Sequence, residues 1–309
     1  MTEPGAPVQA PPPPSMIARR RFAWGTRTFV MGIINVTPDS FSRDGVLAEA
    51  ASPGGTATGQ ASPVERAVAQ ARRMVADGAD ILDVGGESTR PGHQPVPANE
   101  ELRRVVPVIA AIRAALPEAP ISVDTTKAPV AEAAVVAGAN LINDVWGVGV
   151  DDSLARLAAA RGVPLVVMHN REEPRYRDLM VEVIDDLRAA LDRALRLGVR
   201  WDDLIVDPGF GFGKTPDHNL ELLRELESLR VLGRPILLGT SRKSTLGRVL
   251  DLGPDERLEA TLATTALGIA AGADIVRVHD VRDNVRAARI ADAIIRANWR
   301  SEPAEGGPS

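Results

Sequence analysis

The chain has 309 residues, of which 44% are hydrophobic and 25% are charged, and its net charge is −5. This composition is typical of a globular protein with a sizeable core, and the negative charge argues against a protein that acts mainly on nucleic acid. The absence of cysteine excludes disulfides and thiolate catalysis and fits a reducing, cytoplasmic location. No apolar run approaches the roughly 20 residues that span a bilayer, so no membrane partner is expected.

The first residues, MTEPGAPVQAPPPPSMIARRRF, are rich in proline, and their basic residues follow rather than precede any apolar stretch. That order is wrong for a signal peptide, and the four prolines at 11–14 favour extended polyproline, which cannot join a packed core. Residues 1–22 are therefore predicted to be a disordered tail, as are residues 299–309. A single domain is expected between them, over 23–298.

From residue 28 onward, short β-branched runs alternate with longer segments rich in Ala, Leu and Arg. Strands are predicted at 28–36, 80–84, 121–124, 141–144, 164–168, 204–207, 235–238 and 274–278. Helices are predicted at 63–77, 99–116, 129–137, 153–161, 178–197, 218–229, 257–271 and 283–296. The alternation favours parallel βαβ units. Eight of each favour a closed (β/α)₈ TIM barrel, with an open doubly wound sheet as the alternative.

One segment departs from this alternation. Residues 42–63, SRDGVLAEAASPGGTATGQASP, are rich in Gly, Ala, Ser, Thr and Pro and have no sustained period. They follow the first predicted strand, so the first βα loop is long and covers about 37–62. Such a loop is either a flexible insertion or a mobile lid over a site.

Polar residues follow the carboxyl ends of the predicted strands, where a barrel carries its active site. Each one alone has a simpler explanation, because Asp or Ser after a strand often caps the next helix. Their occurrence after all eight strands indicates a polar site instead. The residues are Asn35, Asp39, Asp83, Asp124, Asn143, His169, Asp207, Arg277 and His279.

Two kinds of chemistry are expected there. The loop GTSRKST at 239–245 offers hydroxyls and two cations near a helix start, which suits an anion. Arg277 and His279 point to one side of a strand, and with Asn35 and residues 89–90 they could bind a polyphosphate with Mg²⁺. Buried acids, an amide and a lysine suit a flat heterocycle with several N–H donors. This second group is Asp124, Asn143, Asp207 and Lys243.

The stretch LIVDPGFGFGKT at 204–215 comes close to a nucleotide-binding loop. Only three residues separate Gly209 from Gly213, whereas the P-loop pattern requires four. The spacing argues against a P-loop NTPase and leaves open what the loop binds.

Eight segments resemble dihydropteroate synthases in sequence and order, over about residues 28–296: MGIINVTPDSFS, DVGGESTRPG, SVDTTK, INDVWG, VVMH, DPGFGFGK, GTSRKS and RVHDV. The resemblance implies a (β/α)₈ barrel and a transferase of folate biosynthesis. Such an enzyme joins 6-hydroxymethyl-7,8-dihydropterin diphosphate to 4-aminobenzoate, with SN1-like loss of diphosphate assisted by Mg²⁺. It also implies a sulfonamide target and a homodimer formed through the late helices.

The resemblance assigns roles to the matching residues. It implies that Met168 packs on a pterin held by Asp124, Asn143, Asp207 and Lys243. It places the diphosphate at Asn35, Arg277 and His279, with the metal beside Asn35. It implies that Asp124, Lys243 and Asp39 take part in catalysis. The 4-aminobenzoate pocket would be bordered by Thr89, Arg90, Pro91, Phe212, Lys214 and Ser244, so the glycine-rich loop would shape this pocket and bind no nucleotide.

The sequence departs from the family pattern in its first loop, where FSRDG at 41–45 and a longer insertion replace FSDGG. It departs again at 170–174, where NREEP replaces an Arg-Gly-x-Pro loop. A non-catalytic pterin-binding paralogue and a pterin-dependent methyltransferase remain as alternatives. A methyltransferase needs no diphosphate subsite, so the cations at 242–243 and 277 argue against it.

Overall fold

The computed structural model describes residues 10–37, 61–87, 95–146 and 151–297. Within these ranges, none of the helices is long and apolar enough to cross a membrane. Eight parallel strands form one sheet in the order β8-β7-β6-β5-β4-β3-β10-β9. The strands are β3 (Phe29–Asn35), β4 (Ile81–Gly85), β5 (Ile121–Asp124), β6 (Leu141–Asp144), β7 (Leu165–Met168), β8 (Leu204–Asp207), β9 (Leu237–Leu238) and β10 (Ile275–Val278).

The two edges of this sheet meet. Val206 in β8 forms a parallel bridge with Ile236, directly before β9. The bridge closes the sheet into a barrel, which confirms the predicted (β/α)₈ fold and excludes the open doubly wound sheet.

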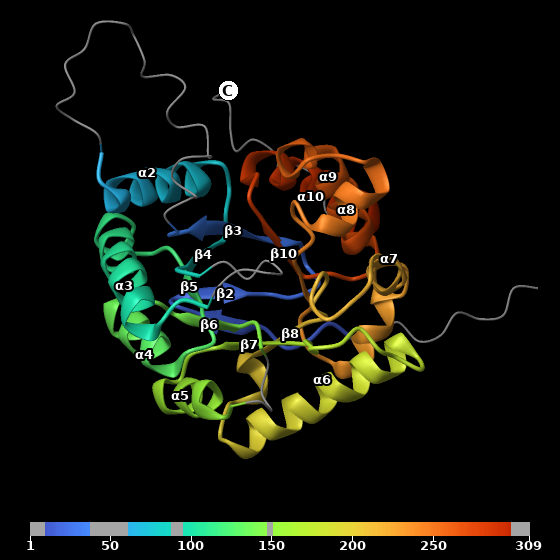
Figure 1. The fold of residues 1–309 in the computed structure, drawn as a ribbon, viewed down its shortest axis with the longest axis horizontal. Coiled ribbons are helices and arrows are strands. Elements are labelled where there is room, and N and C mark those ends of the chain that lie inside the picture. Colours follow the sequence, from blue (N-terminus) through green and yellow to red (C-terminus); the bar gives the residue numbers. More distant parts are fainter. Residues whose placement is uncertain (1–9, 38–60, 88–94, 147–150, 298–309) are drawn as a thin grey trace, which may run out of the picture.

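Helices surround the barrel, running from α2 through α5 on one side of Figure 1 to α6 below and α7–α10 on the other side. In α6, Asp178 caps the helix by accepting a hydrogen bond from the Val181 amide, and an apolar stripe faces the strands. The predicted helix at 218–229 is in fact α7 followed by a 3₁₀ turn (Leu226–Leu232). The helices are α2 (Pro63–Ala76), α3 (Ala98–Ala115), α4 (Ala128–Ala137), α5 (Ser153–Arg161), α6 (Leu179–Arg196), α7 (Pro216–Arg224), α8 (Ser244–Leu250), α9 (Leu258–Ala270) and α10 (Val281–Ile295).

The barrel interior has two halves, because side chains two apart on a strand point to the same side. Near the start of most strands the inward residues are apolar, and Ile81 in β4 and Ile275 in β10 belong to one buried interior cluster. In β5 the inward residue at this level is the buried Ser122. Two residues further along β4 and β10 lie Asp83 and Arg277, which contact each other across β3. The barrel is therefore apolar at its amino end and polar at its carboxyl end.

A β-hairpin covers the amino end. Strands β1 (Ser15–Ile17) and β2 (Arg20–Phe22) pair antiparallel, and β2 lies within the ring of helices in Figure 1. Ile17, Phe22 and Trp24 are buried in the interior cluster, and the Ser15 hydroxyl donates to the Asp202 carbonyl at 2.5 Å. The prediction of a disordered tail over residues 1–22 is thus wrong for 15–22, because these apolar side chains seal an apolar opening that would otherwise face water.

Several predictions lie outside the described residues. They concern the tails at 1–9 and 299–309, most of the long first loop, and the site residues Asp39, Thr89, Arg90 and Pro91.

Candidate active site

Inward-pointing polar side chains from β4, β5, β6, β8 and β10 converge at the carboxyl end of the barrel. Arg277 lies at the centre of this group: its Nε donates to Asp83 at 2.6 Å and one Nη donates to Asp124 at 2.5 Å. Both acids are buried. Their charges outweigh the effect of burial and raise the pKa of Arg277 further above its ordinary range, so its charge is permanent.

Asp124 is a carboxyl group with one unused oxygen. Its Oδ2 accepts from Arg277, while its Oδ1 is buried without a hydrogen-bond partner in the described structure. Burial raises the pKa of Asp124 to about 7, against the opposing charge of Arg277. A buried acceptor without a partner is costly unless a ligand donates to it. Asp124 is therefore placed to accept an N–H from a bound molecule.

Asp83 belongs to the site although the sequence analysis assigned it no role. Its side chain is fully buried, and its Oδ2 also accepts from the Asn143 amide at 3.3 Å. Its Oδ1 has no partner in the part of the chain that the structure describes. Its position two residues after Ile81, matching Arg277 two residues after Ile275, was a signal that could have predicted its contact with Arg277.

The adjacent strands β7 and β8 contribute Met168 and Asp207, which are paired in register. Asp207 Oδ1 accepts from the Gly209 amide at 2.7 Å, and burial raises the pKa of this carboxyl group. Met168 is buried beside it. An apolar thioether next to buried acceptors is suited to a flat heterocycle.

Lys243 lies at the start of α8 and faces the same acids. Burial lowers its pKa to about 8, and Asp207 and Asp124 are among the charges that act on it. Its Nζ lies 3.9 Å from the centre of the Phe212 ring, a cation–π contact. The structure thus brings the predicted pterin residues Asp124, Asn143, Met168, Asp207 and Lys243 to one end of the barrel.

The loop before α8 is held to β10. The Arg242 guanidinium makes a two-pronged ion pair with Asp280, at 2.7 and 3.1 Å. Ser241 Oγ lies 3.0 Å from His279 Nδ1. Of the two cations predicted to serve an anion here, Arg242 is engaged with Asp280, which leaves Lys243 directed to the acids.

The predicted diphosphate residues do not form one separate cluster. Arg277 lies among the pterin residues, whereas His279 lies beside Ser241. Asn35 is partly buried at the end of β3, beside Gly85 of β4. Among the described residues no group of three or more His, Cys, Asp or Glu could hold a metal. One side-chain oxygen at Asn35 nonetheless fits Mg²⁺, which commonly takes one or two protein oxygens and completes its shell with phosphate and water.

Of the residues predicted to border 4-aminobenzoate, Phe212, Lys214 and Ser244 are described. Phe212 is partly buried, and Ser244 is exposed in the first turn of α8. Lys214 Nζ donates to the Gly209 and Phe212 carbonyls, each at 3.1 Å, and lies 2.9 Å from His169 Nδ1. The lysine thus bonds within its own loop and to the neighbouring one, and it does not form part of a phosphate cradle.

The fold and site define a (β/α)₈ barrel with buried acids, an arginine and a lysine gathered at its carboxyl end, an arrangement suited to a small polar ligand. The sequence profile described as "Pterin binding enzyme" matches residues 31–279. A dihydropteroate synthase from Clostridium beijerinckii is 48% identical over 281 residues, which cover 91% of this chain and 99% of that protein.

Solved structures agree. A dihydropteroate synthase from Clostridium difficile, determined in the presence of pteroic acid, is 47% identical with a TM-score of 0.81, covering 89% of this chain and 99% of that one. A dihydropteroate synthase from Xanthomonas albilineans with 4-aminobenzoic acid is 41% identical with a TM-score of 0.82, covering 92% and 98%. The chain belongs to the pterin binding enzyme family and, within it, to the dihydropteroate synthases, which are transferases.

Proposed function

We propose that the protein condenses 6-hydroxymethyl-7,8-dihydropterin diphosphate with 4-aminobenzoate, giving 7,8-dihydropteroate and diphosphate. The observation that carries this proposal is the pair of buried carboxylate oxygens, Asp83 Oδ1 and Asp124 Oδ1, that lack partners among the described residues. A pterin ring has N–H donors that match such acceptors. The relatives' shared name supports the same reaction.

The pterin is held at the polar end of the barrel. Asp83 Oδ1, Asp124 Oδ1 and Asp207 accept from its N–H groups. Asn143 offers an amide oxygen, Lys243 donates to a ring acceptor, and Met168 packs on its face. As diphosphate leaves the pterin CH₂ group, positive charge spreads into the ring. The Asp124 carboxylate stabilises that charge without moving, because Arg277 fixes its position.

The departing diphosphate is bound by cationic and neutral donors. Arg277 uses Nε and one Nη on the acids, and its other Nη is the donor available for an anion. His279 and Asn35 complete this subsite. Mg²⁺ held by Asn35 and the diphosphate oxygens would supply further neutralisation of the leaving charge.

The second substrate enters above the pterin. Phe212 gives an apolar wall, Ser244 gives a hydroxyl, and Thr89, Arg90 and Pro91 are proposed as the facing side, with Asp39 covering the reacting centre. The arylamine then attacks the CH₂ carbon. Because the carbon is already cationic, no strong protein base is required.

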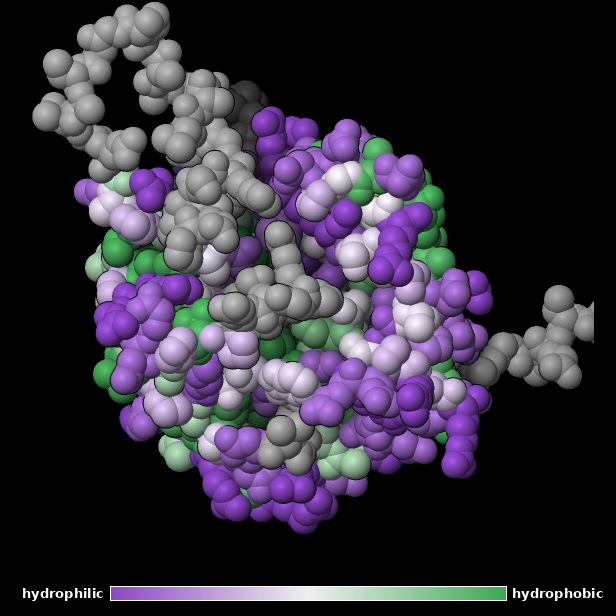
Figure 2. Space-filling model, in the orientation of Figure 1, coloured by the Kyte–Doolittle hydropathy of each residue, from purple (hydrophilic) through white to green (hydrophobic). Residues whose placement is uncertain are grey.

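The proposal also covers the oligomeric state and the cellular location. Exposed apolar side chains on α9 and α10, Leu267, Ile290 and Ile294, support a homodimer through these helices. Figure 2 shows further apolar residues at the edge near α8, where Val249 and Leu250 are exposed. The absence of cysteine supports a cytoplasmic location.

Diphosphate release by the purified full chain tests this function. The pterin diphosphate and Mg²⁺ are supplied with and without 4-aminobenzoate, and dihydropteroate is measured in parallel. Release that depends on the amine, with equal formation of dihydropteroate, is the expected result. Tight pterin binding without dihydropteroate would instead identify a non-catalytic pterin-binding protein.

A further inference from the structure

The loop after β7 and the loop after β8 pack against each other through their backbones. A Cβ atom at Gly209 would collide with the His169 carbonyl, and one at Gly213 would collide with the backbone of Arg171. Both glycines also have positive φ, 70° and 53°, which other residues rarely adopt. The loop that carries Phe212 and Lys214 is therefore built directly on the loop that carries His169 and Arg171.

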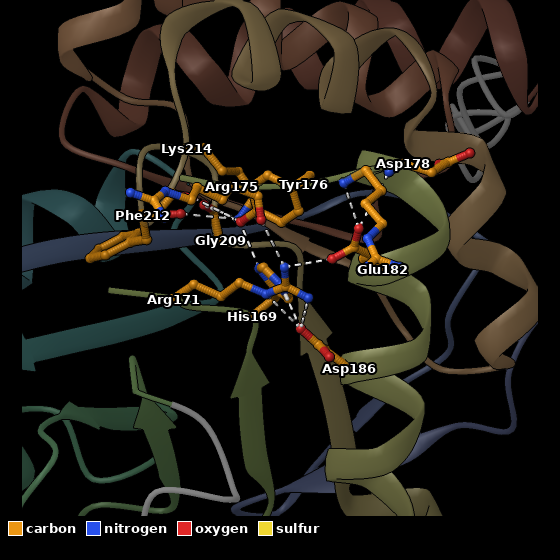
Figure 3. A network of polar contacts seen from close by, with 12 residues as sticks. His169, Arg171, Arg175, Tyr176, Asp178, Glu182, Asp186, Gly209, Phe212 and Lys214 are labelled. Carbon is orange, nitrogen blue, oxygen red and sulfur yellow. Dashed lines mark hydrogen bonds and ion pairs between the residues drawn. The ribbon is translucent and has the colours of Figure 1, made fainter. Parts of the chain in front are cut away.

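Lys214 closes the turn that presents Phe212. The Gly209 carbonyl accepts from both the Phe212 amide, at 3.0 Å, and Lys214 Nζ, at 3.1 Å. With the Phe212 carbonyl and His169 Nδ1, this gives the ammonium group three contacts, the number of donors it has. Figure 3 shows the Phe212 ring directed away from these contacts. The lysine thus holds the backbone, and the ring faces the site.

His169 links Lys214 to α6. Burial lowers the pKa of His169 to about 3, so the ring is neutral. If Nδ1 accepts from the Lys214 ammonium, Nε2 carries the proton and donates to Asp186, which lies 3.2 Å away. One chain of hydrogen bonds thus runs from α6 to the 209–214 loop, through Asp186, His169 and Lys214.

Arg171 fixes the outer end of that chain. Its Nε and Nη2 donate to Asp186 at 3.0 and 2.7 Å, and its Nη1 donates to Glu182 at 2.7 Å. Its guanidinium also lies 4.7 Å from the centre of the Tyr176 ring. The Tyr176 hydroxyl in turn donates to the Gly213 carbonyl at 2.8 Å. Arg171 therefore contacts both residues through which α6 and the 170–176 loop hold the loop of Phe212: Asp186, which bonds to His169, and Tyr176, which bonds to Gly213 (Figure 3).

We propose that Arg171 and Tyr176 are positioning residues for the second substrate: they hold the 209–214 loop so that Phe212 forms the wall of the arylamine pocket. This inference rests on the proposed function and deepens it. Four of the pterin residues stand on the strands and Lys243 stands at the start of α8, all outside the 209–214 loop. The clamp formed by Arg171, Tyr176, Asp186 and His169 should therefore affect the amine far more than the pterin. No substrate contact by the clamp itself is required.

The Arg171→Gln variant tests the inference, with Arg175→Gln as its matched control. Arg175 lies in the same loop, and its ion pair with Glu173 is exposed, with 84% and 65% of the two side chains accessible. We expect Arg171→Gln to raise KM for 4-aminobenzoate roughly tenfold, since charge-assisted bonds are lost. KM for the pterin diphosphate and kcat stay within about twofold, and Arg175→Gln changes none of them.

Two milder variants separate positioning from general unfolding. Tyr176→Phe removes only the bond to Gly213 and is expected to raise KM for the amine roughly threefold. Arg171→Lys retains the charge but loses the two-pronged geometry, so it recovers part of the loss.

Equal rises in both KM values, or an unchanged KM for the amine in folded Arg171→Gln, would overturn the inference. A wild-type chain with no turnover would instead contradict the proposed function. The inference about Arg171 and Tyr176 would then be tested by measuring the affinity of the pterin-saturated wild type and variants for 4-aminobenzoate.

Discussion

The two ends of the barrel are built from the same strands but differ in polarity: one end is apolar and closed, and the other is charged. At the amino end, Ile81 and Ile275 meet the hairpin residues Ile17 and Phe22 in a closed apolar cluster. At the carboxyl end, two residues along the same strands, Asp83 and Arg277 form a charged pair in which Asp83 Oδ1 has no partner among the described residues. A spacing of two residues therefore separates the part that stabilises the barrel from the part that binds, and the two can be altered separately.

Arg277→Met is expected to have the largest effect, because it lowers both the stability of the barrel and its catalytic activity. It leaves Asp83 and Asp124 buried without their common cation, and breaking a buried pair in this way costs about 3–5 kcal/mol. Urea unfolding measures the loss of stability, and turnover should be abolished. Arg193→Met, which breaks a partly exposed pair with Asp152, should cost less than about 1 kcal/mol. Equal stability of the two variants would show that Arg277 is not needed to compensate the acids.

Phe22→Ala tests the amino end alone. The ring is buried and packs against Trp24 and Phe29, so its removal should cost about 3–5 kcal/mol of unfolding free energy. The half-exposed Met16 of the same hairpin is the control, since Met16→Ala removes little buried area. KM for both substrates should stay at the wild-type value. A change in KM would show that the two ends of the barrel are coupled.

Lys243→Ala tests the carboxyl end alone. Burial lowers the pKa of Lys243 while Asp207 and Asp124 act in the opposite sense, so the variant should fold with a stability close to that of the wild type. Its affinity for the pterin diphosphate should fall roughly a hundredfold, since a partly buried charged donor is lost. Calorimetric titration measures this, with Arg248→Ala on the exposed face of α8 as the control. Unchanged affinity would remove Lys243 from the pterin site.

The difference between strands and loops also explains what the sequence could predict. Asp124, Asn143 and Asp207 lie at or next to the ends of strands whose bounds were predicted correctly, and strand geometry then fixes their direction. The hairpin at 15–22 was missed because three-residue strands beside a proline run show no period. The contacts that hold the loop of Lys214 were missed because His169, Asp186 and Tyr176 come from other segments, and loop contacts of that kind follow no periodic rule.

The smallest expected effect concerns the pH dependence that His169 adds. In the folded chain its pKa is lowered to about 3 from a reference value of 6.5, so between these values the unfolded chain binds more protons and stability falls as pH falls. Asp124, with its pKa raised to about 7, acts in the opposite sense over about pH 4–7. Burial also lowers the pKa of Lys214 to about 7, so the wild-type curve alone mixes the contributions of several groups. His169→Gln removes one of them and leaves Asp124 in place. Between pH 7 and pH 5 the wild type should therefore lose about 2 kcal/mol more unfolding free energy than the variant, by urea unfolding at each pH. Parallel curves would mean that His169 is protonated in the folded chain, and the hydrogen-bond chain to Lys214 would then have the opposite polarity or be broken.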